Sequence, residues 1–489
     1  MTDKVTLGTL TTGVPGLDML LGGGLSEFSF NLIAGAPGSG KTTLAHQIMF
    51  TLAGPERRAL FFTVLGEPPL KMLRYQQQYA FFDMSKVGSS IRYVNLADDL
   101  RAGDFSGVLE RIMKEVEEFS PSLVFVDSFR SVVQTARSGN QGVADLQHFV
   151  QELGTRMTSW QATTFLIGEY AQAEADANPI MTVADGVFAL GQHQEKNSVV
   201  RKIRIIKMRG QPHMSGTHTF RISSEGLRIY PRLLPPLADD REPGVPVDHA
   251  PGRISTGVPD LDKLLHGGVP QGHSMLLVGP TGCGKTILGT RFLQAGVSLG
   301  EKGVAVYFEK GTARLRNAEL ARMVQAGDVT VVESRSLDLS VEELVDDLLS
   351  ALDRTGARRV VIDSLSEMSL YLATEFRGDL RDAVFRMLAA LARRGVTVIV
   401  TFGLEDRFAD LRFSQADISF LTDAIVAMRY AEIEGQLAKV ITVVKVRGCS
   451  HSHDLREYNI TDKGIEIDSH ATRYDGLLNG RTTRRPSNG

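Results

Sequence analysis

The chain has 489 residues, enough for two to four domains, and its apolar fraction of 43% and charged fraction of 23% are ordinary for a soluble globular protein. A net charge of -3 argues against a protein dedicated to nucleic acid, and no apolar run approaches the length that spans a bilayer. The beginning of the chain lacks the apolar core of a signal peptide, and the two cysteines, Cys283 and Cys449, stand outside any CxxC pair, so we expect a reducing, cytoplasmic location without a zinc site or disulfide framework.

The first long predicted element is a buried strand from Phe28 to Ala34, which leads into a glycine-rich loop. The loop at 35–42 reads Gly-Ala-Pro-Gly-Ser-Gly-Lys-Thr and matches the phosphate-binding pattern GxxxxGK[ST] without a mismatch. Its glycines let backbone N–H groups turn toward phosphates, and a helix predicted from Thr42 to about Ala53 points its positive end at the same oxygens. We predict an ATP and Mg²⁺ site in which Lys41 reaches the β- and γ-phosphates and the Thr42 hydroxyl holds Mg²⁺.

The rest of the first half alternates strands and helices. Strands are predicted from Ala59 to Val64, Leu123 to Val126 and Thr163 to Gly168, which together favour an α/β domain with a mainly parallel sheet. Two alternating segments follow, from Val199 to Met208 and from Thr217 to Ile222, with turn residues between them. They predict an antiparallel extension at one edge of that sheet.

The second half of the chain repeats the first. A second loop at 279–286, Gly-Pro-Thr-Gly-Cys-Gly-Lys-Thr, begins 244 residues after the first (279 − 35), so Lys285 and Thr286 take the roles of Lys41 and Thr42. Thr-Gly-Val-Pro-x-Leu-Asp at 12–18 recurs at 256–262, and Lys-x-Arg-Gly at 207–210 recurs at 445–448. A period this long indicates two complete domains of one fold. We expect domains at 1–232 and 253–471, an extended proline-rich linker at 233–252, and a flexible basic tail at 472–489.

Carboxylates at strand ends are the candidate chemical groups. Asp127 and Asp363 each end an apolar run, where a P-loop ATPase places its second magnesium-organising carboxylate. Glu309 follows the predicted strand 304–308 and is the candidate base that orients or deprotonates the attacking nucleophile, and we count it as a possible metal contact as well. In the first half Glu67 stands one or two positions later, so we expect that domain to bind ATP and to hydrolyse it slowly.

The Lys-x-Arg-Gly segments place two cations on one face of a strand, because alternate residues of a strand share a face. A pair of this kind is a solvated sheet edge or an arginine finger that enters the nucleotide site of a neighbouring subunit. Its presence beside the same glycine in both halves favours the finger. Lys207 and Arg209 form the first pair, and Lys445 and Arg447 form the second.

Tandem P-loop domains that open with Thr-Gly-Val-Pro-x-Leu-Asp and close with Lys-x-Arg-Gly resemble the KaiC ATPases of the bacterial circadian clock, from about Thr12 to about Arg473. The resemblance implies two RecA-like domains, a two-tiered homohexamer with ATP between subunits, ATP hydrolysis, and autophosphorylation in the second tier. The predicted nucleotide contacts of the first domain are Gly35, Gly38, Ser39, Gly40, Lys41, Thr42, Thr43, Lys207, Met208, Arg209 and His213. Those of the second are Gly279, Thr281, Gly282, Cys283, Gly284, Lys285, Thr286, Ile287, Lys439, Lys445, Val446 and Arg447.

The sequence also departs from the clock proteins. They phosphorylate an adjacent Ser-Thr pair, and here Ser419 matches the serine while Phe420 stands where the threonine would be. A phenyl ring accepts no phosphoryl group, so Ser419 is the one candidate phosphosite of the pair. By this resemblance we expect the tail at 472–489 to lack the longer extension that binds the KaiA activator, and we expect no activator of that type. A KaiB-like protein, or a signalling histidine kinase with its response regulator, remains as a candidate partner beside the chain's own copies.

Two other functions remain open. A RecA- or RadA-type DNA-dependent ATPase shares the P-loop, the aspartate and the glutamate, but no basic cluster or aromatic platform for single strands is visible in the sequence. An ATP-gated scaffold, in which nucleotide only holds a ring together, fits the imperfect first site. We expect nucleic acid and membranes not to be partners.

Overall fold

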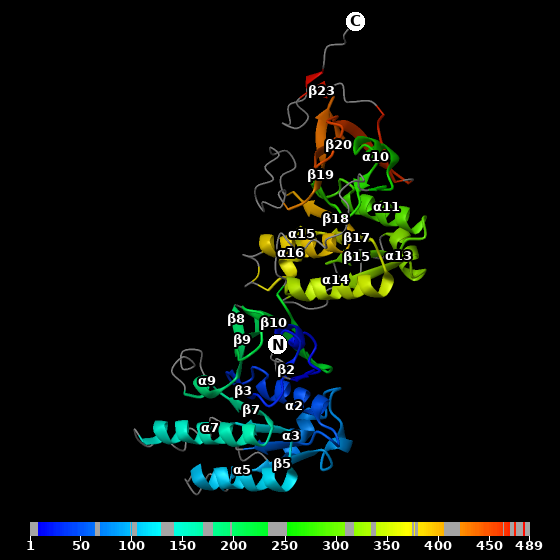
Figure 1. Ribbon diagram of the computed structural model, residues 1–489. Coiled ribbons are helices and arrows are strands. Elements are labelled where there is room, and N and C mark those ends of the chain that lie inside the picture. Colours follow the sequence, from blue (N-terminus) through cyan, green and yellow to red (C-terminus); the bar gives the residue numbers. More distant parts are fainter. Residues whose placement is uncertain are drawn as a thin grey trace, which may run out of the picture. The chain divides into compact units, whose positions relative to one another are not determined.

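Two compact units make up the chain, Met1–Arg232 and Leu233–Gly489. This computed structural model describes residues 8–63, 69–97, 99, 105–128, 141–169, 179–195, 198–232, 252–308, 317–333, 339–373, 376, 380–404, 421–462, 464–469, 474–475 and 483–484. The expected linker at 233–252, except for its last residue, and most of the expected tail lie outside these ranges. Figure 1 shows the first unit in blue to green and the second in green to red.

The first unit is built on a nine-stranded sheet with the order β11-β10-β9-β8-β3-β7-β6-β4-β5. Its parallel part contains β3 (Phe30–Gly35), β4 (Ala59–Thr63), β5 (Ile91–Asn95), β6 (Leu123–Asp127), β7 (Thr163–Gly168) and β8 (Gly186–Glu195). The antiparallel part adds β9 (Ser198–Met208), β10 (His218–Ser223) and β11 (Gly226–Tyr230). Strands β3 and β7 are buried along their whole length, as expected of a sheet that is covered on both faces.

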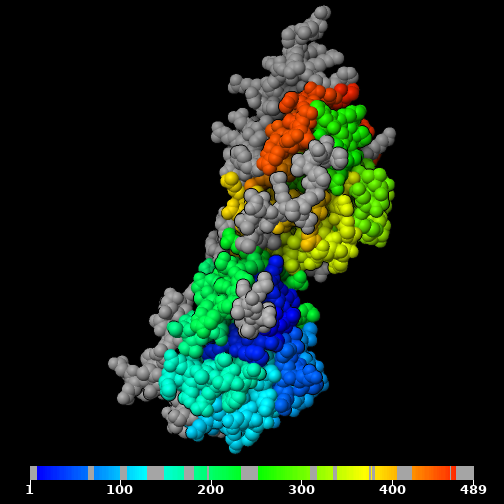
Figure 2. Space-filling view, in the orientation of Figure 1, coloured from blue at the N-terminus to red at the C-terminus, as the bar shows by residue number. Residues whose placement is uncertain are grey.

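Helices cover both faces of this sheet. Helices α5 (Phe105–Phe119) and α7 (Gln141–Ser159) pack on one face, and α2 (Lys41–Leu52) packs on the other. Figure 2 shows α5 and α7 as the cyan outer surface of this unit. The shorter elements are β1 (Thr9–Leu10), α1 (Leu17–Leu20), β2 (Leu25–Ser26), α3 (Pro69–Gln76), a 3₁₀ turn at Met84–Lys86, and α9 (Pro179–Val183).

The second unit repeats this plan with the strand order β16-β15-β17-β18-β14-β19-β20-β21-β22. The parallel strands are β14 (Ser274–Gly279), β15 (Gly303–Tyr307), β16 (Val329–Glu333), β17 (Arg359–Asp363), β18 (Thr397–Gly403) and β19 (Ala424–Ile433). The antiparallel strands are β20 (Gln436–Val446), β21 (Arg456–Thr461) and β22 (Gly464–Ile467).

The helices of the second unit are arranged in the same way. Helices α14 (Val341–Thr355), α15 (Leu365–Tyr371) and α16 (Leu380–Arg393) cover one face, and α11 (Lys285–Val297) and α13 (Ala318–Gln325) cover the other. The short elements are β12 (Arg253–Ile254), α10 (Pro259–Leu264), β13 (Val269–Pro270), β23 (Tyr474–Asp475) and β24 (Thr483–Arg484).

The predicted fold class is confirmed: two tandem α/β domains of RecA type, each with a mainly parallel sheet and an antiparallel extension at one edge. The element bounds differ from the sequence predictions by at most two residues, as is usual at strand and helix ends, and β7 matches at both ends. The strand predicted at 28–34, for example, is β3 at 30–35, because Phe28 lies in the left-handed region with φ 61 and does not pair in the sheet.

The Thr-Gly-Val-Pro-x-Leu-Asp segments fold into the same hydrogen-bonded turn in both domains. Asp18 accepts hydrogen bonds from the backbone N–H and the hydroxyl of Thr12, at 2.9 and 2.7 Å. Asp262 accepts the equivalent bonds from Thr256, at 2.8 and 2.7 Å. The threonine and aspartate of the repeat therefore have a structural role. They bond to each other and hold the start of a short helix, α1 or α10, in place.

Arg359, at the start of β17, is a buried cation of the second domain. Its side chain donates to Glu301 at 2.6 Å and to the carbonyl oxygens of Ser255 and Phe292 at 2.8 and 3.1 Å. The residue is 1% exposed, so these partners replace water around its guanidinium group. Leu123 begins the matching strand β6 in the first domain, so this polar anchor belongs to the second domain.

Candidate nucleotide-binding sites

Each P-loop lies at the carboxyl end of a central parallel strand, where ligands of open α/β sheets bind. Helices α2 and α11 begin at the loop lysines, directly after Gly40 and Gly284, which have φ 97 and 98. A Cβ at Gly284 would approach Ile460 Cδ1 to 2.9 Å, and a Cβ at Gly40 would approach Ile222 Cδ1 to 2.8 Å. The left-handed conformation therefore favours glycine at this position in both loops, and a Cβ there would also displace the end of an isoleucine side chain.

The loop lysines point into their own loops. Lys41 Nζ donates to the Ala36 carbonyl at 2.8 Å, and Lys285 Nζ donates to the Gly279 and Pro280 carbonyls, both at 2.8 Å. Burial lowers the pKa of Lys41, while Glu169 and Asp127 oppose that shift. The ammonium groups thus lie where the phosphates of a nucleotide in the loop would be.

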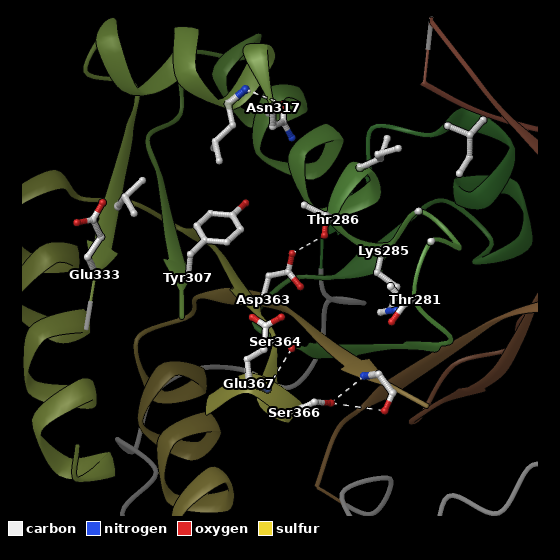
Figure 3. A pocket seen from close by; sticks show the side chains of 17 residues that line it. Thr281, Lys285, Thr286, Tyr307, Asn317, Glu333, Asp363, Ser364, Ser366 and Glu367 are labelled. Atoms are coloured by element: carbon white, nitrogen blue, oxygen red, sulfur yellow. Dashed lines mark hydrogen bonds between the residues drawn. The ribbon is translucent and has the colours of Figure 1, made fainter. Parts of the chain in front are cut away.

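In each domain a threonine of the loop is hydrogen-bonded to an aspartate at the end of another parallel strand, β6 in the first domain and β17 in the second. In the sheet, one strand separates each of these from the P-loop strand. Thr42 Oγ1 donates to Asp127 Oδ2 at 2.7 Å, and Thr286 Oγ1 donates to Asp363 Oδ2, also at 2.7 Å. Figure 3 shows the second bond as a dashed line. Hydroxyl and carboxylate oxygens suit Mg²⁺, which takes one or two protein ligands and fills its remaining positions with water and substrate phosphate. The donor set at each loop therefore fits the predicted ion.

The environments of the two aspartates differ. Thr401 stands beside Asp363 on the neighbouring strand and donates a second hydroxyl hydrogen bond to its carboxylate, whereas Ile167 takes that place beside Asp127. Burial raises the pKa of Asp127 to about 6, against the opposing effects of Thr42 and Lys41. A hydroxyl donor favours the charged form of a carboxylate, and burial among apolar groups disfavours it. The second site is thus the better prepared of the two to bind a cation.

A pocket of about 450 Å³ adjoins the second P-loop. Its lining consists of Thr281, Gly282, Gly284, Lys285, Thr286, Ile287, Tyr307, Asn317, Leu320, Val331, Glu333, Asp363, Ser364, Ser366, Glu367, Gly403 and Ile460. In Figure 3, Tyr307 stands between Glu333 and Asp363, and the Glu367 carboxylate points toward Asp363. The pocket therefore combines the P-loop with the carboxyl ends of several strands.

The two Lys–Arg pairs lie at the opposite end of their own sheet from its P-loop. Arg209 Nη1 donates to Asp185 at 2.9 Å, and Lys207 Nζ donates to the carbonyls of Met181 and Thr182 at 3.3 and 3.2 Å. In the second domain, Arg447 Nη1 lies 3.4 Å from Asp423, and Lys445 Nζ donates to the Thr422 carbonyl at 2.9 Å.

The lysines of these two pairs, Lys207 and Lys445, both have a lowered pKa. Desolvation, followed by the neighbouring arginine, lowers the pKa of Lys207 and of Lys445.

Comparison with known proteins identifies the family of this chain. The family model for the KaiC ATPase matches residues 10–233 and again 254–472. The chain belongs to the KaiC ATPase family. The circadian clock oscillator protein KaiC of Picosynechococcus sp. is 27% identical over 488 residues, which cover 97% of this chain and 92% of that protein. The KaiC proteins of Rippkaea orientalis and Thermostichus vulcanus are 26% and 27% identical, over 99% and 97% of this chain and 93% and 92% of their own.

The family assignment confirms the predicted resemblance and, with it, ATP as the nucleotide of a tandem P-loop ATPase. Several predicted residues of this KaiC-type chain lie outside the described residues: Glu67, Glu309, Ser419 and Phe420. Tyr307, two residues before Glu309, ends β15 and lines the pocket. The roles of these four residues stay predictions.

Other predicted nucleotide contacts are distributed over the domains. Ser39 and Cys283 are fully buried within their loops, and Gly38, Thr43, Gly282 and Ile287 belong to the loops or to the first turn of the helices that follow.

Lys439 lies near the second P-loop. Its Nζ lies 5.9 Å from the Tyr430 ring, whose hydroxyl is 3.5 Å from the Thr281 carbonyl of that loop. Lys439 therefore lies toward its own P-loop, at the other end of β20 from Val446 and Arg447. Met208 is buried at the end of β9, and His213 is half-buried beyond it.

Sequence reasoning missed several pocket residues, namely Tyr307, Asn317, Glu333, Ser366 and Glu367. Glu333 ends a parallel strand, as Asp363 does, and that shared position is a signal that could have found it. Glu367 has its own signal in Ser364-x-x-Glu367, the pattern of a helix N-cap, and its N–H donates to Ser364 Oγ at 3.3 Å.

Two negative findings hold for the described part of the chain. Its helices include none with the length and apolar character that crossing a membrane requires. Within the same residues, no three His, Cys, Asp or Glu side chains are grouped to hold a metal ion. A magnesium ion at a P-loop needs no such cluster, because substrate phosphates complete its coordination.

Proposed function

We propose that this chain is a KaiC-type ATPase that assembles into a homohexamer, hydrolyses ATP between its subunits, and phosphorylates its own serine in the second domain. The observation that carries the proposal is the duplicated arrangement of a complete P-loop with its Thr–Asp pair at one end of the central strand, and a Lys–Arg pair at the other. Membership of the KaiC ATPase family supports the reaction and the nucleotide.

The distance along the central strand argues that ATP is shared between subunits. Strand β14 runs from Ser274 to Gly279, the first residue of the P-loop. Ser274 is hydrogen-bonded to Asp423, which also pairs with Arg447. Five residue steps at about 3.3 Å separate the two ends by about 17 Å, which an arginine side chain does not span. Arg447 and Arg209 are therefore placed to act on the nucleotide of another subunit, and each nucleotide would need two chains.

The chain's own groups have distinct tasks in the proposed reaction. Backbone N–H groups of the loop and Lys285 bind the β- and γ-phosphates, and the Thr286–Asp363 pair is the protein part of the Mg²⁺ site. When bound, Mg²⁺ offsets the negative charge that develops on the phosphate oxygens. Glu309 accepts a proton from water as the water oxygen bonds to the γ-phosphorus and the bond to the bridging oxygen of ADP breaks.

The serine kinase reaction would use the same site with a different acceptor. The Ser419 hydroxyl takes the place of water: its oxygen bonds to the γ-phosphorus, Glu309 accepts its proton, and the bond to the bridging oxygen of ADP breaks. The first domain, with a raised pKa at Asp127 and with Glu67 displaced by one or two positions, would mainly bind ATP and hold the ring together. A KaiB-like protein, or a histidine kinase with its response regulator, would read the state of that ring.

The proposal is tested by measuring phosphate release and native mass of the full chain with and without Mg-ATP. We expect a hexamer with ATP, and turnover that falls by about 100-fold or more at the second site in Glu309→Gln, in line with the loss of a general base. Glu67→Gln is the matched change in the first domain and should alter total turnover little. A monomer in saturating ATP overturns the assembly, and unchanged turnover in Glu309→Gln shows that the assigned base is wrong.

A further inference from the structure

An aspartate precedes the strand beside each P-loop strand and joins three parts of the domain. The Asp185 carboxylate accepts a hydrogen bond from the Phe30 N–H at 3.1 Å through Oδ2 and from Arg209 Nη1 at 2.9 Å through Oδ1. Its backbone repeats both links, since its N–H donates to the Phe30 carbonyl at 2.7 Å and its carbonyl accepts from the Arg209 N–H at 2.8 Å. Asp185 therefore ties the finger arginine to the first residue of β3.

Asp423 repeats this arrangement in the second domain. Its Oδ2 accepts from the N–H and the hydroxyl of Ser274, at 3.0 and 2.9 Å, and its Oδ1 lies 3.4 Å from Arg447 Nη1. Its N–H donates to the Ser274 carbonyl at 3.0 Å, and its carbonyl accepts from the Arg447 N–H at 2.7 Å. The P-loop strand begins with Phe30 in the first domain and with Ser274 in the second. The aspartate, the arginine, and both the side-chain and the backbone contacts between them are nevertheless the same in the two domains.

Folding stability does not explain the ion-pair part of this arrangement. The side chains of Arg209 and Arg447 are both 60% exposed, and ion pairs with that much exposure add little to stability. An arginine that is free to rotate loses much conformational freedom when it binds a phosphate, and a fixed one loses less. The ion pair therefore adds little to the stability of the fold. Its effect is to hold the guanidinium group in one orientation.

We propose that Asp185 and Asp423 are positioning residues, which hold Arg209 and Arg447 in the orientation that meets the nucleotide of a neighbouring subunit. The inference rests on the proposed function, because it assigns the arginines to a neighbour's site. The aspartates themselves touch no nucleotide in this proposal. They act through the arginines, and their backbone links keep the start of the P-loop strand and the finger in register.

The test is a double-mutant cycle in the full chain with Asp423→Asn, Arg447→Ala and the double variant, by steady-state phosphate release with Mg-ATP. We expect Asp423→Asn to lower kcat by roughly fivefold with little change in KM, because the arginine then reaches its place less often. In the Arg447→Ala background the same change should have no further effect. Asp185→Asn with Arg209→Ala repeats the cycle in the first domain, where the readout is the ATP concentration that forms the hexamer, measured by native mass, because that domain is proposed to bind ATP rather than to turn it over. This second cycle keeps the test open if a variant of the second domain fails to fold.

Two controls separate positioning from loss of structure. Ser274→Ala removes a donor to Asp423 on the strand side and leaves the arginine in place, so it should keep wild-type turnover. Asp328→Asn removes the exposed pair with Lys302, at 2.8 Å, and should also have no effect. The proposal is overturned if Asp423→Asn keeps full turnover, or if it costs the same factor with and without Arg447. Unchanged turnover in Arg447→Ala would overturn the proposed function itself, and the positioning role with it.

Discussion

The hydroxyl group of Thr401 donates a hydrogen bond to the carboxylate of Asp363, and no hydroxyl stands in that place in the first domain, where Ile167 lies beside Asp127. The two strands meet in the same register in both domains, so on this side of the aspartate the contrast comes from one side chain; on the other side Thr63 lies beside Asp127 and Tyr307 beside Asp363. It makes the two nucleotide sites chemically unequal although their loops are alike.

We expect Thr401→Val to weaken Mg-ATP binding at the second site about fivefold, since one hydrogen bond to the carboxylate is worth about 1 kcal/mol. Binding is measured by calorimetry in a Lys41→Ala background, in which the first loop no longer contributes. Ile167→Thr in a Lys285→Ala background is the reciprocal change and should tighten the first site. Equal affinities before and after both changes would show that the hydroxyl has no part in cation binding.

Gly284→Ala should abolish tight nucleotide binding at the second P-loop. The new Cβ would be strained at φ 98 and would come within 2.9 Å of Ile460 Cδ1, so the loop or the Ile460 side chain has to shift. Gly300→Ala is the matched control, because Gly300 also has φ 78 but faces open space. We expect Gly300→Ala to cost about 1 kcal/mol of stability from backbone strain alone and to leave nucleotide affinity unchanged. Similar affinities for the two variants would contradict the packing argument.

Incubation with Mg-ATP should place one phosphate on Ser419, as detected by mass spectrometry of proteolytic peptides. Lys285→Ala and Ser419→Ala should both remove it, the first by disabling the loop and the second by removing the acceptor. Phe420→Thr supplies the hydroxyl that the clock proteins have at this position and should allow a doubly phosphorylated peptide. A protein that hydrolyses ATP and stays unmodified at Ser419 would show that the kinase half of the proposal is wrong.

Arg359→Ala should destabilise the second domain by about 2–4 kcal/mol, since it leaves the carbonyl groups of Ser255 and Phe292 without their donor and removes the partner of the partly exposed Glu301. Lys302→Ala removes an exposed ion pair and should change stability by less than about 1 kcal/mol. Urea unfolding of the full chain, followed through the transition of the second domain, compares them. Arg359 would have no anchoring role if the two variants unfolded at the same urea concentration.

Much of the fold could be predicted because its signals are local. The loops at 35–42 and 279–286 define a strand before them and a helix after them, and an apolar run that ends in Asp127 or Asp363 defines the next part of the site. Their offset along the chain showed the duplication. The nucleotide and the family followed from these short segments, and the family model supports both.

The rest of the pocket depends on contacts that are distant in sequence. Tyr307 and Glu333 come together with Asp363 because β15 lies between β16 and β17, and strand order is not written in any one segment. The role of Thr401 depends in the same way on the register between β17 and β18. Lys439 shows the converse: it is close in sequence to Arg447, yet the length of β20 separates the two.

Strand β14 carries a P-loop at its carboxyl end and is bonded to the Asp423–Arg447 pair at its amino end. In the proposed assembly each subunit therefore gives a finger to one neighbour and takes one from the other, a head-to-tail contact. An open string of such subunits would leave one loop without a finger and one finger without a loop in every tier. A closed assembly completes every site and an open string does not, so the polarity of a single strand favours closure over a filament.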